Sequence, residues 1–367
     1  MKKMFVSGNE AAGWGAVNAG CTHFFGYPIT PQNEIPTWFA REMPVRGRVF
    51  VQSQSEVASI NLVFGASAAG ARVMTSTSSP GWSLMLEGMS HLTYAELPAV
   101  IVLVQRGGPG AGTIRHAQMD YLSVTHGGGH GGYKTITLAP ASVQEIHDLT
   151  QLAFYLSDKY RNPAVVLSDA ILGQMMEPIE SKTIDFGPLP AKDWALAGKS
   201  KHKSGEYQEV HCSQGVITPL KYLSSIEKMD RKYREIAEKE VRYEAYRTED
   251  AELILVSYGY LARVGKEVVD MARGEGLRIG MLRPVTLWPF PSRIIGEYAG
   301  RGVSFLVVED SLGQMVDDVR LAVCGKSGVS FIGMLARNSG SDLGIILPDR
   351  VLEEVRGLMK EESRNAS

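Results

Sequence analysis

Four short segments place reactive or ligand-binding side chains directly after apolar runs. The first is HFFGYPITPQNEIP, residues 23–36, in which an apolar run ends at Gly26 and two prolines flank Thr30. Pro31 suits the first position of a helix, with Thr30 as the N-cap and Glu34 complementing the helix dipole. A helix start with a free hydroxyl and free N–H groups could hold a carboxylate, although Thr30 could equally serve only as a cap.

The other three segments carry a carboxylate, a group of hydroxyls and a guanidinium. FVQSQSEVASINLVFGASAAGA puts Glu56 near the start of a helix of small and apolar residues, as a dipole partner or a functional acid. MTSTSSPGWS is rich in small hydroxyl residues, and VQRGGPGAG places Arg106 at the end of the most apolar strand. A lone arginine there is usually a surface charge or an ion-pair partner, but at this edge it would meet the other three segments.

Alternating strand and helix signals must position these four corners. Residues 1–175 contain fully apolar strand patterns, such as AVIVLVQ at 99–105, separated by helical stretches. Such strands predict an α/β fold with a parallel sheet covered on both faces. Open sheets of this kind bind ligands at the carboxyl ends of their strands, which is where the four corners fall.

The remainder of the chain is predicted to hold a connection and a second unit. Residues 176–248 form the linker and connecting helix, with an irregular stretch over 173–205 that includes KHKSG and a charged helix over 224–247. Residues 249–367 form a second α/β unit, with strand patterns in ELILVSYG, LRIGMLRPVTLWPFP and VSFLVVEDS. Helices are expected at 261–274, at 314–323 and from 348 onward.

Composition restricts the classes of function. The 367 residues carry a net charge of -2 and are 44% hydrophobic, so neither nucleic acid nor an anionic membrane is indicated as a partner. No apolar run approaches the ~20 residues that span a bilayer, and a strand-like run from Met4 leaves no room for a signal peptide, so a cytoplasmic location is expected. Cys21, Cys212 and Cys324 are far apart, which argues against a disulfide framework, a zinc site or an iron–sulfur cluster.

Taken together and in order, the four corners resemble the α subunit of the 2-oxoacid:ferredoxin oxidoreductases. The resemblance is strongest to the branched-chain (2-oxoisovalerate) and 2-oxoglutarate groups and covers nearly the whole chain. It is carried by YPITP, QSQSEVAS, TSTSSPG and RGGPGAG, and also by GGGHGGY, DKYRNPAVVLSDAILGQMMEP, LRPVTLWPFP and VVEDSLGQM. It implies a thiamine-diphosphate-binding fold, in which a pyrimidine-binding domain is joined to a transketolase C-terminal-like α/β domain.

The resemblance also implies a reaction and roles for residues. Enzymes of this family use thiamine diphosphate to decarboxylate a 2-oxoacid, pass electrons through iron–sulfur clusters to ferredoxin and transfer the acyl group to coenzyme A. Glu56 matches the glutamate that binds the aminopyrimidine ring of the cofactor, a task that suits a desolvated carboxyl. Thr30 and Arg106 match the residues that bind the substrate's carboxylate and carbonyl, and Pro28 is expected beside the cofactor ring.

Two features of the family are absent from the sequence. There is no GDG motif for the diphosphate and magnesium, and no cysteine run of the ferredoxin type. The resemblance therefore implies a partner β subunit that binds the diphosphate and Mg²⁺, with γ and ferredoxin-like δ subunits as further partners. The iron–sulfur clusters would lie on those subunits, and this chain would supply half of a cofactor site and be inactive alone.

Several alternatives stay open at this point. A branched-chain 2-oxoacid is favoured as substrate, but 2-oxoglutarate, pyruvate and an aromatic 2-oxoacid such as phenylglyoxylate remain candidates. Trp82 would either shape the acyl pocket or face the core or an interface. The chain could also be a non-catalytic scaffold of such a complex, or a transketolase-type or decarboxylase fragment without electron transfer.

Two segments downstream of Arg106 have less certain roles. His126 and His130 are four residues apart, but the glycines of GGGHGG predict a mobile loop that could cover the substrate or coenzyme A. We expect no metal there. Gln118 and Asp120 are expected to support the loop in which they lie.

Overall fold

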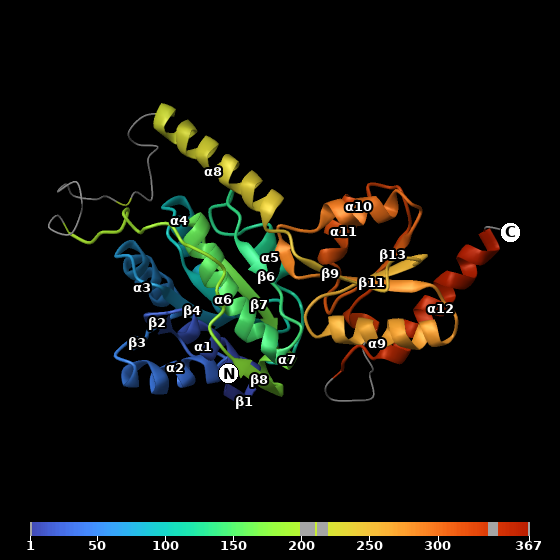
Figure 1. Cartoon of the computed structure of the whole chain (residues 1–367), viewed down its shortest axis with the longest axis horizontal. Coiled ribbons are helices and arrows are strands. Elements are labelled where there is room, and N and C mark those ends of the chain that lie inside the picture. Colours follow the sequence, from blue (N-terminus) through green and yellow to red (C-terminus); the bar gives the residue numbers. More distant parts are fainter. Residues whose placement is uncertain (1, 199–209, 211–218, 337–343, 366–367) are drawn as a thin grey trace.

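The chain folds into two α/β units that lie side by side (Figure 1). The computed structural model describes residues 2–198, 210, 219–336 and 344–365. The KHKSG stretch and Cys212 lie outside the described residues. Within these ranges, none of the helices combines the length and apolar character needed to traverse a bilayer.

The first unit is built on a seven-stranded sheet. Its order is β12-β6-β7-β5-β4-β2-β3, with every neighbouring pair parallel except the pair of β12 and β6. The strands are β2 (His23–Gly26), β3 (Val49–Gln52), β4 (Val73–Ser78), β5 (Val100–Gln105), β6 (Ile136–Leu138), β7 (Ala164–Asp169) and β12 (Thr286–Trp288). Every residue of β4, β5 and β7 is buried, which confirms the predicted parallel sheet covered on both faces.

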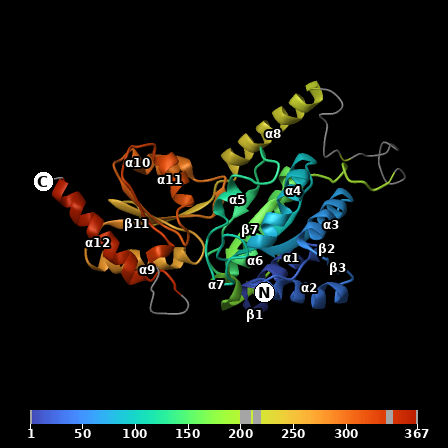
Figure 2. The ribbon, with the colours of Figure 1, turned by 180° about the vertical axis from the view of Figure 1, so that it is seen from behind.

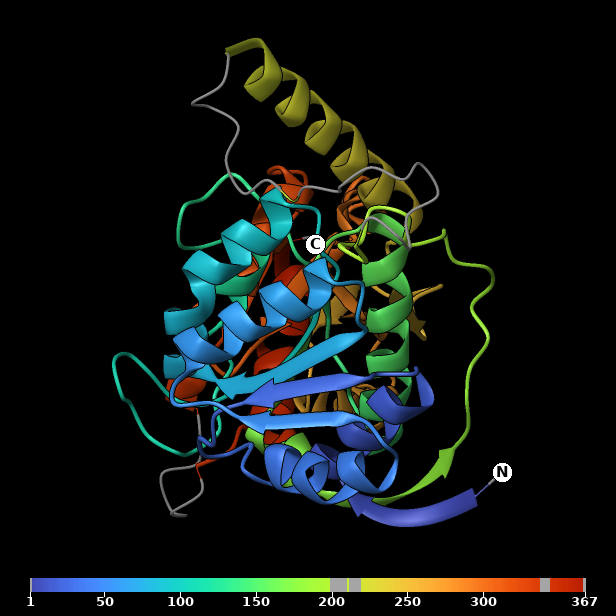
Figure 3. The same ribbon diagram turned by 90° about the vertical axis from the view of Figure 1, so that its left-hand side faces the viewer.

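Helices cover both faces of this sheet, as the view onto its β3 edge shows (Figure 3). One face is packed by α1 (Gly8–Asn18), α2 (Glu34–Val45) and α6 (Val143–Tyr160). The other is packed by α3 (Glu56–Ala68), α4 (Ser79–Tyr94) and the short α5 (Tyr121–Thr125). One more short helix, α7 (Ala170–Gln174), follows β7.

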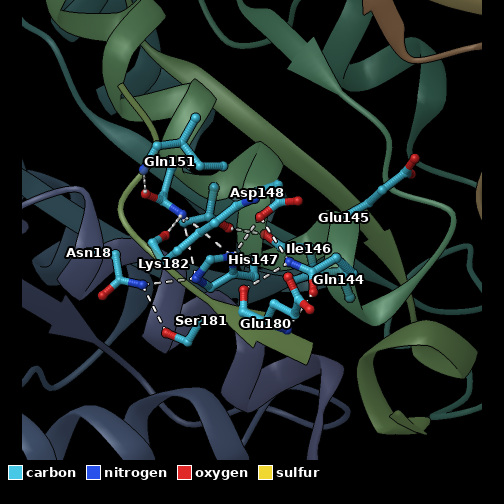
Figure 4. A network of polar contacts seen from close by, with 12 residues as sticks. Asn18, Gln144, Glu145, Ile146, His147, Asp148, Gln151, Glu180, Ser181 and Lys182 are labelled. Atoms are coloured by element: carbon cyan, nitrogen blue, oxygen red, sulfur yellow. Dashed lines mark hydrogen bonds and ion pairs between the residues drawn. The ribbon is translucent and has the colours of Figure 1, made fainter. Parts of the chain in front are cut away.

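A two-stranded ribbon borders the helical layer formed by α1 and α6. β1 (Lys2–Ser7) pairs antiparallel with β8 (Met176–Ser181), so the irregular stretch expected from residue 173 is wrong over these six residues. Buried His147 of α6 lies at the centre of the polar network beside the ribbon (Figure 4). Its Nε2 accepts from Asn18 of α1 over 3.0 Å, which leaves the proton on Nδ1, 2.7 Å from Asp148. Asn18 also donates to Ser181 over 2.9 Å, so the network fastens β8 to both helices.

The second unit has a five-stranded sheet with the order β14-β13-β10-β11-β9. Only β9 runs antiparallel to its neighbour. The strands are β9 (Tyr243–Tyr246), β10 (Leu253–Val256), β11 (Ile279–Pro284), β13 (Ser304–Val308) and β14 (Val329–Ile332). α9 (Leu261–Gly274) and α12 (Pro348–Asn365) pack on one face, and α10 (Ser292–Ala299) and α11 (Met315–Val323) on the other.

The long charged helix is shorter than the sequence predicts at its carboxyl end. α8 (Pro219–Lys239) projects away from the first unit (Figures 1 and 2). The predicted helix over 224–247 is wrong over its last eight residues, because α8 ends at Lys239 and residues 243–246 form β9, which pairs with β11. Pairing with β11 gives these residues backbone partners within a sheet, so tertiary contacts override the local helical pattern.

One strand from the second half of the chain joins the sheet of the first unit. β12 follows β11 in sequence but joins the sheet of the first unit, where it pairs with β6. β9, by contrast, belongs to the second sheet although it precedes the predicted start at residue 249. The division into residues 1–175, 176–248 and 249–367 stays a prediction.

Candidate active site

Four parallel strands deliver the four corners to one edge of the first sheet. β5, β4, β2 and β3 lie side by side in that order. Because the carboxyl ends of parallel strands meet at the same edge, the segments that follow them converge. These segments begin at Arg106, Ser79, Tyr27 and Ser53.

Glu56 is the first residue of α3, and it is a largely buried residue whose carboxylate has no partner among the described residues. The N-cap is Ser55, whose Oγ accepts from the N–H of Ala58 over 3.2 Å. The Glu56 residue is 5% exposed, yet among the described residues no hydrogen bond or ion pair reaches its carboxylate. A Cβ on Gly81 would lie 2.5 Å from Glu56 Oε1 and 2.1 Å from Thr77 Oγ1, so only glycine lets α4 begin this close.

The structure corrects the local role predicted for Thr30. Thr30 is not an N-cap, because α2 begins four residues later at Glu34 and Asn33 precedes it as the cap residue. The reason is the fully buried Gln32, which accepts from Ser76 Oγ over 2.6 Å and donates to the carbonyl of Tyr27 over 3.1 Å. These bonds hold residues 27–32 as a loop against β4. The hydroxyl of Thr30 instead accepts from the Asn33 amide over 3.2 Å.

Arg106 follows β5, and its guanidinium bridges two loops. Nη1 donates to the carbonyl of Thr30 and Nη2 to that of Ala111, each over 2.8 Å. Its backbone N–H donates to Ser79 Oγ over 2.9 Å, which fixes the arginine against the start of α4. Nε is buried and has no hydrogen-bond partner within the described part of the chain. A guanidinium with an unused N–H can bind a carboxylate oxygen.

A cavity of about 370 Å³ lies beside Arg106. This volume is within the range of small-molecule sites. The lining consists of Ser79, Ser83, Arg106 and residues 108–110, 119–120 and 312–314. Neither Thr30 nor Glu56 lines it, so Arg106 connects the cavity to the first corner. Sequence reasoning missed Ser79 and residues 312–314, for which the signals were the hydroxyl-rich corner and the VVEDSLGQM motif.

Asp120 supplies a carboxyl group to this cavity. Burial raises its pKa to about 6, against the opposing effects of a hydrogen bond from Ser79 and the positive charge of Arg106. Ser79 Oγ donates to Asp120 Oδ2 over 2.5 Å, and the Asp120 N–H donates to Gln105 Oε1 over 3.2 Å. Asp120 therefore places a carboxyl group in the cavity beside Arg106, and its role in supporting the loop stays a prediction.

Three other predicted residues lie away from the cavity. Trp82 is buried in the core with 1% exposure, so the interpretation that it shapes the acyl pocket is wrong. His126 lies 3.4 Å from Asp318, and nowhere in the described ranges do three metal-ligating side chains gather. Pro28 is exposed in the loop after β2, where it neighbours Tyr27.

Comparison with known proteins defines the family. A model of pyruvate flavodoxin/ferredoxin oxidoreductase, thiamine diphosphate-binding, matches residues 14–245, and a model of pyruvate:ferredoxin oxidoreductase core domain II matches residues 251–345. The chain belongs to this family of 2-oxoacid:ferredoxin oxidoreductases. Its first unit is a thiamine-diphosphate-binding domain.

Two curated relatives match over nearly their whole length. The ketoisovalerate oxidoreductase subunit VorB of Methanothermobacter marburgensis is 45% identical, over 97% of this chain and 99% of that protein. The 2-oxoglutarate synthase subunit KorA of the same organism is 36% identical, also over 97% and 99%. Both are named as subunits, so each of these two relatives belongs to an enzyme made of more than one chain.

Solved structures agree on the fold. The 2-oxoglutarate:ferredoxin oxidoreductase from Magnetococcus marinus, with 2-oxoglutarate, coenzyme A and succinyl-CoA bound, superimposes with a TM-score of 0.83 at 26% identity. That match covers 97% of this chain and 65% of the longer chain. A split-gene transketolase in an inactive tetramer, 13% identical with a TM-score of 0.58, covers 96% and 97% and shares the fold alone.

The residues present fit the pyrimidine half of thiamine diphosphate. A ring nitrogen needs a desolvated carboxyl that nothing else occupies, and Glu56 meets both conditions among the described residues. Gly81 keeps the space above that carboxyl free of a side chain. The sequence offers no GDG motif for the diphosphate, so the fit covers one half of the cofactor.

Proposed function

We propose that the chain is the α subunit of a thiamine-diphosphate-dependent oxidoreductase that converts a branched-chain 2-oxoacid into an acyl-CoA, CO2 and reduced ferredoxin. The observation that carries the chemistry is the buried, unpartnered carboxyl of Glu56 at the edge where Arg106 meets Thr30. The observation that favours the substrate is identity: 45% and 46% to two ketoisovalerate subunits, against 35–37% to the 2-oxoglutarate subunits.

Each site residue has a task that its surroundings permit. Glu56 binds the aminopyrimidine ring through its carboxyl group, which lies in largely buried surroundings where a hydrogen bond to a ring nitrogen is strengthened. Pro28 packs beside that ring. Arg106 and Thr30 bind the carboxylate and carbonyl of the 2-oxoacid, with Arg106 Nε as the unused donor. When bound, thiamine diphosphate supplies the electron sink for decarboxylation.

The chain requires partners for the rest of the reaction. A β subunit binds the diphosphate and Mg²⁺, and γ and ferredoxin-like δ subunits carry iron–sulfur clusters with the β subunit and pass electrons to ferredoxin. Support comes from the missing GDG motif, from three cysteines too far apart in sequence for a cluster motif, and from relatives that are named subunits. Coenzyme A is the co-substrate that accepts the acyl group.

Sequence and structural similarity support 2-oxoglutarate as the alternative substrate. Relatives at 35–37% identity are 2-oxoglutarate synthase subunits, and the superimposed structure contains 2-oxoglutarate. Turnover of 2-oxoglutarate in place of 2-oxoisovalerate would keep the class of enzyme and change the substrate.

The test is to purify the chain with the subunits that accompany it and to follow viologen reduction with coenzyme A. Four acids are compared: 2-oxoisovalerate, 2-oxoglutarate, pyruvate and phenylglyoxylate. We expect the highest kcat/KM for 2-oxoisovalerate. A complex that contains its clusters and thiamine diphosphate but turns over none of the four would contradict the proposed function and favour the scaffold.

A further inference from the structure

We propose that Leu312, which the second α/β unit presents to the cavity, is a specificity-determining residue that contacts the side chain of the 2-oxoacid and selects apolar chains over chains that end in a carboxylate. The proposal rests on the proposed function, since it concerns the substrate of that site. It adds a role for the second unit, to which none of the predicted site residues belongs.

A buried carboxyl group gives the loop before α11 a defined shape. Glu309, at the end of β13, is fully buried. Its Oε1 accepts from the N–H groups of Gln314 and Val316 over 2.9 and 3.0 Å. Its Oε2 accepts from the N–H of Met315 and the hydroxyl of Ser311, both over 3.0 Å. Four donors on one carboxylate fix the loop between β13 and α11.

The loop is also fastened to the first unit. Gln314 Nε2 donates to the carbonyl of Met119 over 2.8 Å, and Gln314 Oε1 accepts from the N–H of Leu122 over 2.9 Å. Next to it, Gln118 and Asp310 exchange two bonds, from Gln118 N–H to the Asp310 carbonyl over 2.8 Å and from Asp310 N–H to Gln118 Oε1 over 3.0 Å. These four bonds hold the loop in register with the wall of the cavity that residues 119–120 provide.

Leu312 is the side chain that this arrangement presents. It is 66% exposed and belongs to neither core cluster, so the packing of the unit does not explain an apolar residue here. It lines the same cavity as Arg106, together with the apolar side chains of Met119 and Pro109. A 2-oxoacid whose carboxylate is bound by Arg106 can place its side chain against these three residues.

The charges in the cavity oppose a second carboxylate on the substrate. Apart from Arg106, which the first carboxylate occupies, no cationic side chain among the residues that the structure describes lines the cavity, and the lining includes the carboxyl of Asp120. A second carboxylate would therefore lose water to an apolar wall and approach a group of like charge. A methyl or isopropyl group carries no charge, so it neither loses hydration at the apolar wall nor is repelled by Asp120.

The experiment compares substrates in the complete complex. We would measure kcat and KM for 2-oxoisovalerate, 2-oxoglutarate and pyruvate in the wild type, Leu312→Ala and Leu312→Arg. The matched control is Leu321→Arg, an identical change at an exposed leucine of α11 that does not line the cavity. We expect Leu312→Arg to lower the ratio of kcat/KM for 2-oxoisovalerate over 2-oxoglutarate by roughly tenfold, mainly through KM, because one group in a pocket discriminates on this scale.

Leu312→Ala should lower kcat/KM for 2-oxoisovalerate roughly fivefold and spare pyruvate, whose methyl group reaches less of the wall. This variant keeps the test decisive if Leu312→Arg fails to assemble, since a ratio of substrates does not depend on the active fraction. Ratios that match the wild type overturn the proposal, as does a change confined to the KM of coenzyme A. A wild-type complex without turnover would instead contradict the proposed function itself.

Discussion

At the scale of the residue, the most informative feature is Glu56, a largely buried residue whose carboxylate has no hydrogen-bond partner among the described residues. Buried carboxylates normally have partners, because desolvation without compensation is costly. Glu56 is buried and has none among the described residues, whereas Glu309, also buried, accepts four hydrogen bonds. Glu309 therefore holds its loop in shape, whereas the Glu56 carboxylate is left available for the ligand that the proposed function requires.

Replacing Glu56 by Gln should abolish turnover and leave the complex assembled. Gln keeps the shape of the side chain but cannot share a proton with a ring nitrogen, so kcat should fall by at least roughly 100-fold. Stability should hold, since no partner among the described residues loses a bond. Viologen reduction and size-exclusion chromatography measure the two effects. Glu87→Gln, on the exposed face of α4, is the control. Near-normal activity of Glu56→Gln would refute the assignment.

Asp120 should make substrate affinity depend on pH. With a pKa of about 6, it is neutral below that pH and anionic above it. Two groups face the Asp120 carboxyl. Ser79 donates a hydrogen bond to it, and the positive charge of Arg106 offsets part of the rise in its pKa. The anion repels the substrate's carboxylate, so KM should rise roughly fivefold as the pH increases through 6. In Asp120→Asn, KM should be low and flat across this range. A profile unchanged by the substitution would exclude Asp120 as the titrating group.

Sequence reasoning predicted that these residues converge, for a partly wrong local reason. Thr30, Glu56 and Arg106 were predicted to converge because parallel strands end at one edge, and the bond from Arg106 to the Thr30 carbonyl shows that two of them meet. The capping role of Thr30 failed because Gln32 binds across to Ser76 on another strand. A contact over 44 residues is invisible to a local pattern.

At the scale of the element, the start of α4 decides where the site residues lie. Gly81 sits where a Cβ would overlap Thr77 and Glu56, and Ser79 bonds to both Arg106 and Asp120. One helix start therefore sets the position of the Glu56 carboxyl and of the cavity. The sequence shows only that small residues gather at the start of α4. How closely this helix start approaches Glu56 depends on packing and is seen only in the structure.

Gly81→Ala should impair activity more than stability. The added methyl group must displace Glu56 or the start of α4, so we expect a loss of roughly 100-fold in kcat/KM with a modest fall in the melting temperature. Gly65→Ala in α3 is the matched control, because no atom lies within 4 Å of its Cβ and alanine favours helix. Wild-type kcat/KM in Gly81→Ala would show that the close approach has no function.

Helices and strands could be predicted where their own residues show a clear hydrophobic pattern. The buried strands and α9 follow from apolar runs and helical periodicity. β8, β9 and β12 were not predicted, because none of them is a fully apolar run and each pairs with a strand distant in sequence. Such strands owe their stability to the sheet they join, and only the folded chain reveals that sheet.

At the scale of the whole molecule, the second unit is part of the site. β12 extends the first sheet, and residues 312–314 line the cavity beside Arg106. The two units should therefore keep one relative placement during the reaction. The junction that enforces this placement includes Arg283 of β11, which is buried and donates twice to Glu145 of α6 over 2.8 Å.

Arg283→Met should weaken this junction. The change leaves Glu145 without the guanidinium that binds it, while Glu244 keeps its ion pair with Lys266, and because both carboxylates are one-third exposed we expect a loss of about 2 kcal/mol, less than for a fully buried pair. A lower melting temperature should coincide with a higher KM for the 2-oxoacid, since the second unit shapes the cavity. Arg278→Met, at a fully exposed ion pair with Glu252, should change neither quantity. If Arg283→Met lowers stability but KM is unchanged, the second unit does not shape substrate binding through this contact.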